Sequence, residues 1–109
     1  MKLILAVIQH EDQDALTDAM ELEGMHVTRI GSSGGFLRAS NVTLMTAVED
    51  QQVKRVMALL GKHCKRRTKK GHPWVPSTEA REQLLGAIPV EIGGAVVFIL
   101  SLERVEKIG

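Results

Sequence analysis

The chain has 109 residues, of which 44% are hydrophobic and 25% charged, and its 14 Lys and Arg against 13 Asp and Glu leave a formal net charge of +1. These values exclude gross disorder and a strong overall field toward nucleic acid or membrane. One cysteine excludes an internal disulfide, and the longest apolar runs fall far short of the ~20 residues of a membrane span, so we expect a cytoplasmic protein of one domain, residues 1–109.

The first part of the chain predicts a strand, a helix and a second strand. The continuous apolar run Leu3–Ile8 has strand length and the pattern of a central strand covered on both faces. A helix follows, with Asp12 as its predicted cap, and ends before Gly24. Residues 26–30 alternate as a strand, and Gly31–Gly35 predicts a turn.

The middle of the chain predicts a strand at residues 41–48 and a second helix, capped by Asp50 and ending near Cys64. The buried stripe of this helix is expected at four positions: Val53, Val56, Met57 and Leu60. Residues 65–87 hold much of the Pro and polar punctuation, which predicts a long, mobile, basic loop.

Two strands, residues 89–92 and 95–102, close the chain around Gly93-Gly94. The order predicts an α+β fold of the ferredoxin-like βαββαβ type, an antiparallel sheet with both helices on one face. Glycines inside a strand pattern indicate either a bulge or a close approach of a ligand. Because the second face of the sheet is apolar, it needs cover, most simply from another copy of the chain.

Six of the 14 basic residues lie within nine positions: Lys62, Lys65, Arg66, Arg67, Lys69 and Lys70. This run is either a solvated surface, balanced in charge by the acidic first helix, or a binding surface for phosphates or an acidic partner. The histidines and Cys64 lack the spacing of a zinc site, and we see no constellation of nucleophile, base and acid. We therefore expect neither a metal site nor an enzyme, and no cofactor.

The segment Gly31–Asn41 begins with three glycines and two serines in five residues and also contains Phe36 and Asn41. Its N–H groups can bind phosphate or base edges, the phenyl ring offers a stacking face, and the amide can donate and accept as the edge of adenine requires. An ordinary glycine-rich hairpin, with Phe36 in the core, is the alternative.

Three stretches together resemble the PII-like cyclic-di-AMP receptor family: residues 2–9, residues 28–43 with Gly34-Gly-Phe-Leu-Arg38, and Pro89–Phe98. The resemblance spans almost the whole chain. It implies a PII-like homotrimer that binds one cyclic di-AMP in each cleft between subunits and has no enzymatic activity. It also implies that the ligand reorders residues 65–87 and so relays the signal to a protein partner, which the sequence does not identify.

The resemblance also implies the ligand-binding residues. Thr28 would face the ligand, Asn41 would read the base edge, and three residues would line the adenine pocket: Gly35, Phe36 and Leu37. Gly93 and Gly94 match the family pattern near the cleft.

The chain departs from the family pattern at three positions. His26 stands where arginine is frequent, and Ser40 and Ala47 stand where glycine is frequent. His26 and Ala47 are nevertheless carried as site residues. The alternative is a diverged PII-like trimer that no longer binds cyclic di-AMP and uses its basic loop for an acidic partner or nucleic acid; a nucleic acid is the less expected of the two.

Overall fold

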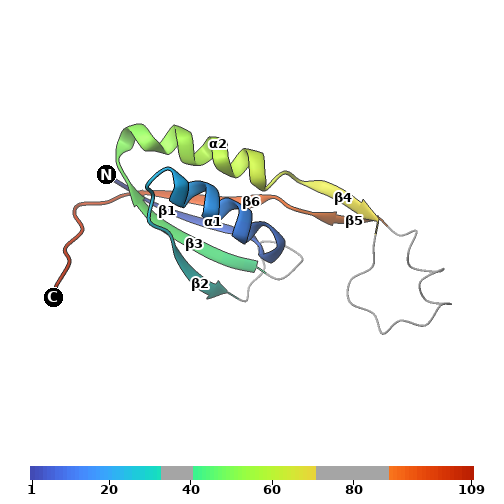
Figure 1. Ribbon diagram of the computed structural model, residues 1–109, viewed down its shortest axis with the longest axis horizontal. Coiled ribbons are helices and arrows are strands. Elements are labelled where there is room, and N and C mark those ends of the chain that lie inside the picture. The colour runs from blue at the N-terminus through green and yellow to red at the C-terminus, as the bar shows by residue number, and fades with distance from the viewer. Residues whose placement is uncertain (33–40, 71–88) are drawn as a thin grey trace.

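The computed structural model describes residues 1–32, 41–70 and 89–109, and in these ranges an antiparallel sheet of order β2-β3-β1-β6 carries two α-helices on one face (Figure 1). The elements are β1 (Lys2–Gln9), the 3-10 turn η1 (His10–Asp12), α1 (Gln13–Leu22), β2 (Thr28–Ser32), β3 (Asn41–Val48), the 3-10 turn η2 (Asp50–Gln52), α2 (Val53–His63), β4 (Arg67–Lys70), β5 (Pro89–Ile92) and β6 (Ala95–Ser101). The strand order is that of the predicted ferredoxin-like fold, which is confirmed.

The core lies between the sheet and the helices. Alternate residues of β1 face the helices, and Ile4, Ala6 and Ile8 are almost completely buried there. They belong to one cluster with residues of α1 and α2: Leu16, Met20, Val56, Leu59 and Leu60. The predicted stripe of α2 is correct at Val56 and Leu60, but Met57 is 41% exposed and Leu59 takes its place.

Asp12 occupies the predicted cap position before α1, whereas Asp50 is not a helix cap. The side chain of Asp12 makes no capping hydrogen bond, because its carboxylate binds an arginine far along the chain. Before the second helix, Glu49 caps the 3-10 turn η2 and forms a reciprocal capping box with Gln52, which is the N-cap residue of α2. Asp50 instead lies 3.1 Å from the N-terminal amine of Met1. An aspartate before each helical pattern therefore marked the start of the helix, but its side chain binds a cationic group elsewhere in the chain instead of the helix backbone.

Strand boundaries differ from prediction by one residue in β1 and β6, and by more at two places. The second strand begins two residues later than expected, and it includes Gly31, which was assigned to a turn. Within the predicted loop 65–87, β4 pairs in antiparallel register with β5, so the loop prediction is wrong for Arg67–Lys70. The β4–β5 ribbon extends beyond the end of the main sheet (Figure 1).

Over the second face of the sheet lies no helix of the described residues (Figure 1). The register places Leu5 opposite both Met45 and Phe98, and Leu3 opposite Leu100, all on this open face. Phe98 is 42% exposed and Leu100 45%. Among the described residues of one chain, the expected cover of the central strand on both faces is thus met on only one face.

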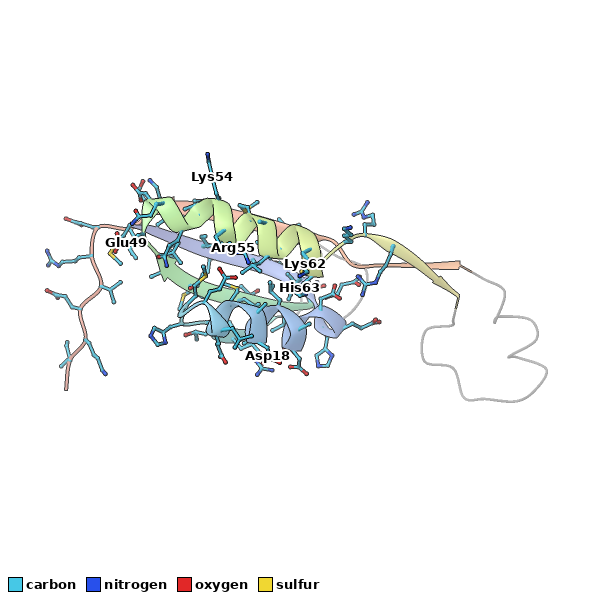
Figure 2. All side chains as sticks on the ribbon, turned by 45° about the horizontal axis from the view of Figure 1, so that its top comes forward. Asp18, Glu49, Lys54, Arg55, Lys62 and His63 are labelled. Atoms are coloured by element: carbon cyan, nitrogen blue, oxygen red, sulfur yellow. The ribbon has the colours of Figure 1, made fainter. Side chains whose placement is uncertain are left out.

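The outer surface of the helices is charged. Arg55 of α2 donates to Glu23 at 2.6 Å, which ties α2 to the end of α1 and lowers the pKa of the Glu23 carboxyl. Lys54 and Asp18 lie on opposite sides of the helix pair and point outward (Figure 2). No helix in the described ranges is long and apolar enough to span a bilayer.

Candidate functional site

Three predicted site residues lie on the open face of the sheet. Thr28 pairs with Met45, Asn41 pairs with Gln9 and Ala47 pairs with Leu3, and these positions share one side of the pleat. Thr28 and Ala47 are exposed, and Asn41 is half-buried. The side that carries these residues is therefore the side with the apolar surface described above.

His26 precedes β2, and its side chain is exposed. Its carbonyl accepts a hydrogen bond of 2.7 Å from the buried hydroxyl of Thr46 in β3. This bond holds the approach to β2 against β3, so the backbone that leads to Thr28 is fixed.

Gly35, Phe36 and Leu37, the predicted adenine pocket, lie outside the described residues, as does Ser40. The strands that flank this segment pair with each other: Ser32 at the end of β2 is opposite Asn41 at the start of β3. The choice between a ligand pocket and a core position for Phe36 therefore stays a prediction.

Gly93 and Gly94 connect β5 to β6, with φ of +89° and +91°. The Gly93 N–H donates to Gln9 Oε1, and the Gly94 N–H donates to the carbonyl of Cys64 at 2.6 Å. A Cβ at Gly93 would lie 2.0 Å from the carbonyl oxygen of Lys65. The expected close backbone approach is real, but among the described residues the approaching group is the protein's own chain.

Gln9 is the residue that sequence reasoning missed at this end of the sheet. Its side chain is only 4% exposed, it is the register partner of Asn41, and it binds Gly93. In the sequence it marks only the end of an apolar run. A buried polar residue at a strand end signals a bonded partner, but the sequence does not say which one.

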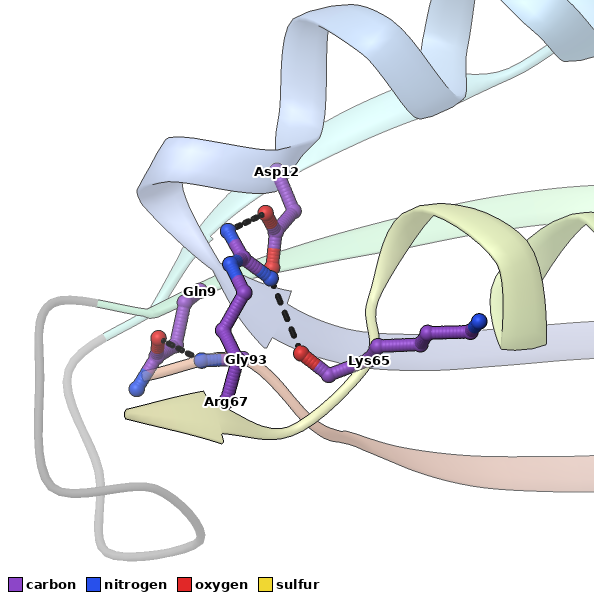
Figure 3. Close-up of polar contacts among 5 residues, drawn as sticks. All are labelled: Gln9, Asp12, Lys65, Arg67 and Gly93. Carbon is purple, nitrogen blue, oxygen red and sulfur yellow. Dashed lines mark hydrogen bonds and ion pairs between the residues drawn. The ribbon is translucent and has the colours of Figure 1, made fainter. Parts of the chain in front are cut away.

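Asp12 and Arg67 form an ion pair beside Gln9 (Figure 3). Arg67 Nη2 donates to Asp12 Oδ1 at 2.8 Å, and Arg67 Nη1 donates to the Lys65 carbonyl at 2.9 Å. Asp12 is 4% exposed, and the hydrogen bond to it raises the pKa of the Arg67 guanidinium. One cation of the basic run therefore holds the base of the β4–β5 ribbon and is already neutralised by a carboxylate.

Cys64 follows the last residue of α2, and its carbonyl accepts the N–H of Gly94 in the same region. Burial, and next the charge of Asp12, raise the pKa of its thiol to about 11. The thiol is thus protonated at neutral pH, as expected for a structural cysteine. The part of the chain that the structure describes holds no group of three His, Cys, Asp or Glu side chains placed to bind a metal.

Most of the predicted site residues that the structure describes fall into two groups along β3. Asn41 lies at one end of β3, where its register partner Gln9 binds Gly93, the neighbour of Gly94. Thr28 and Ala47 lie toward the other end. Asn41 and Ala47 are six strand residues apart, about 20 Å. Within one chain, the described residues do not bring these two groups together around one small molecule.

Comparison with known proteins gives two results. A family model described as cyclic-di-AMP receptor matches residues 1–108. A crystal structure of a functionally unknown protein from Pediococcus pentosaceus ATCC 25745 is similar, with 27% sequence identity and a TM-score of 0.76, over 98% of this chain and 96% of that one.

Proposed function

The chain belongs to the cyclic-di-AMP receptor family, and we propose that it binds cyclic di-AMP in the clefts between the subunits of a homotrimer and relays this binding to a protein partner. The role proposed is recognition and signalling, without catalysis. The observation that carries it is the placement of candidate ligand residues at both ends of one open, apolar sheet face.

The exposed apolar side chains of this face support assembly. Ile30, Phe98 and Leu100, on strands β2 and β6, are each more than 40% exposed, at 42%, 42% and 45%. Burial of apolar area stabilises an interface by roughly 25 cal/mol per Å². Packing this face against other copies covers the side of the sheet that the two helices leave open.

The separation of the two groups supports a ligand that lies between chains. In a closed ring, each copy presents the Asn41 end to one neighbour and the Thr28 end to the other. A cleft then receives one group from each of two chains. The proposed site is complete only in the assembly.

The β4–β5 ribbon is the proposed route to the partner. Its base touches the Asn41 end of the sheet through Gly93 and Gln9, and it is held by Arg67 and Asp12. A ligand beside Asn41 would therefore lie next to the point where the ribbon leaves the body of the protein.

Calorimetric titration with cyclic di-AMP, together with light scattering, tests the proposal. We expect a trimer that binds one ligand per subunit, discriminates against cyclic di-GMP by about tenfold or more, and loses affinity in Asn41→Ala. Gln51→Ala, an exposed amide outside the sheet, is the matched control. A trimer that binds no cyclic di-AMP would favour the diverged interaction protein, and a monomer of 12.0 kDa would refute the site between subunits.

A further inference from the structure

Gln9 contacts two segments at the Asn41 end of the sheet, one through its backbone and one through its carboxamide. Its backbone pairs with Asn41 across β1 and β3, and its Oε1 accepts the N–H of Gly93 (Figure 3). These two partners come from segments more than 50 positions apart in the sequence, 41 and 93. Gln9 thus links β3, which carries Asn41, to the junction of β5 and β6: its backbone pairs with β3, and its side chain binds Gly93.

The hydrogen bond also sets the direction of the carboxamide. The backbone N–H of Gly93 is a donor, and Oε1 is the only acceptor in the carboxamide of Gln9. The Nε2 group, which can only donate, must therefore point away from Gly93. Figure 3 shows the nitrogen turned from Gly93 in this way. Because Gln9 is 4% exposed, the orientation is held by burial as well as by the bond.

Gly93 has little freedom on its other side. The Lys65 carbonyl would lie 2.0 Å from a Cβ at this position, and the same carbonyl accepts from Arg67, which Asp12 holds in turn. The Gly93 peptide therefore lies between the start of the ribbon and Gln9, whose strand β1 pairs with β3.

From these contacts we propose that Gln9 is a positioning residue for the cyclic dinucleotide: by binding the Gly93 amide it fixes the Gly93–Gly94 backbone beside Asn41. This inference rests on the proposed function for its ligand. It predicts that loss of the Oε1 acceptor disturbs both the Gly93 amide and ligand affinity, although Gln9 itself is not a candidate contact of the base.

The test compares Gln9→Leu, which removes the acceptor, with Gln9→Glu, which keeps an oxygen for the Gly93 N–H. In ligand-free protein, we expect hydrogen exchange of the Gly93 amide to accelerate at least tenfold in Gln9→Leu and to stay slow in Gln9→Glu. Calorimetry should show about tenfold weaker binding of cyclic di-AMP to Gln9→Leu. Gln51→Leu, the same substitution at an exposed site, should change neither quantity.

Each outcome is decisive. Wild-type affinity in Gln9→Leu would overturn the positioning role, and fast Gly93 exchange in Gln9→Glu would show that the acceptor is not what holds the glycine. If Gln9→Leu does not fold, the Gln9→Glu exchange measurement still decides the contact. If the wild-type protein binds no cyclic di-AMP while the exchange results hold, the proposed function fails and the contact stands.

Discussion

Asp12 and Arg67 are 55 residues apart in the sequence, yet a carboxylate oxygen of the first lies 2.8 Å from a guanidinium nitrogen of the second. Asp12 belongs to the turn after β1, and Arg67 is the first residue of β4. The pair fastens the base of the β4–β5 ribbon to the end of the central strand. It also makes a nearly buried carboxylate dependent on one arginine, which leads to the first prediction.

Arg67→Ala should lower the free energy of unfolding by about 1–3 kcal/mol, because it leaves the buried Asp12 carboxylate without its charged donor. Lys65→Ala is the matched control, since it removes a nearby cation whose backbone, but not its side chain, belongs to the cluster (Figure 3). Urea denaturation of the ligand-free protein measures both. An equal decrease in the free energy of unfolding in the two variants would mean that the loss of one positive charge, and not the pair with Asp12, causes the effect.

Gly93→Ala and Gly61→Ala should shift stability in opposite directions. Two features of Gly93 disfavour alanine: its φ is +89°, and an added Cβ would lie 2.0 Å from the Lys65 carbonyl oxygen. We expect a loss of about 2–6 kcal/mol, from about 1–3 for each effect. A Cβ at Gly61, inside α2, meets nothing within 4 Å, so alanine should stabilise by about 0.5–1 kcal/mol. Thermal melts of the two variants that moved in the same direction would contradict this reading.

Cys64 should react slowly with iodoacetamide in the folded protein. Its pKa of about 11, against an ordinary 9.0, lowers the thiolate fraction at pH 8 by about 100-fold. Mass spectrometry of folded and urea-unfolded protein measures the ratio of rates. A similar rate in both states would show that the thiol is not buried.

The same shift gives a pH dependence of stability. Between pH 9 and about 11 the unfolded thiol releases its proton while the folded thiol retains it, so the free energy of unfolding should fall as pH rises through this window. Cys64→Ala should remove this contribution. An unaltered alkaline slope in that variant would assign the loss to other groups.

The open sheet face should control assembly. Phe98→Glu places a charge on this face, where Phe98 is opposite Leu5, and should convert the proposed trimer to monomers at micromolar concentration. Leu22→Glu is the control, since Leu22 is 88% exposed at the end of α1, in the helix layer. Light scattering measures both. A trimer that survived Phe98→Glu would place the interface elsewhere.

The sequence by itself determined the order of the two helices and of the four strands of the main sheet, but not β4, and it indicated an apolar second face, because periodicity and strand alternation are local properties of the chain. Residues 41–48 and 89–92 were predicted with the bounds that the structure has. The resemblance to the family, carried by residues spread over the chain, also held.

Tertiary structure decided the partners of polar residues. Asp12 and Asp50 were expected to cap helices, a local choice, but Arg67 and the N-terminal amine compete for them from distant parts of the chain. The sequence indicated no role for Gln9 beyond its place at a strand end. The proposed role depends on the hydrogen bond with Gly93, which only folding brings beside Gln9. Hydrophobic pattern repeats along the sequence and can be read there, whereas a hydrogen bond between distant segments depends on positions that only the packed sheet and helices define.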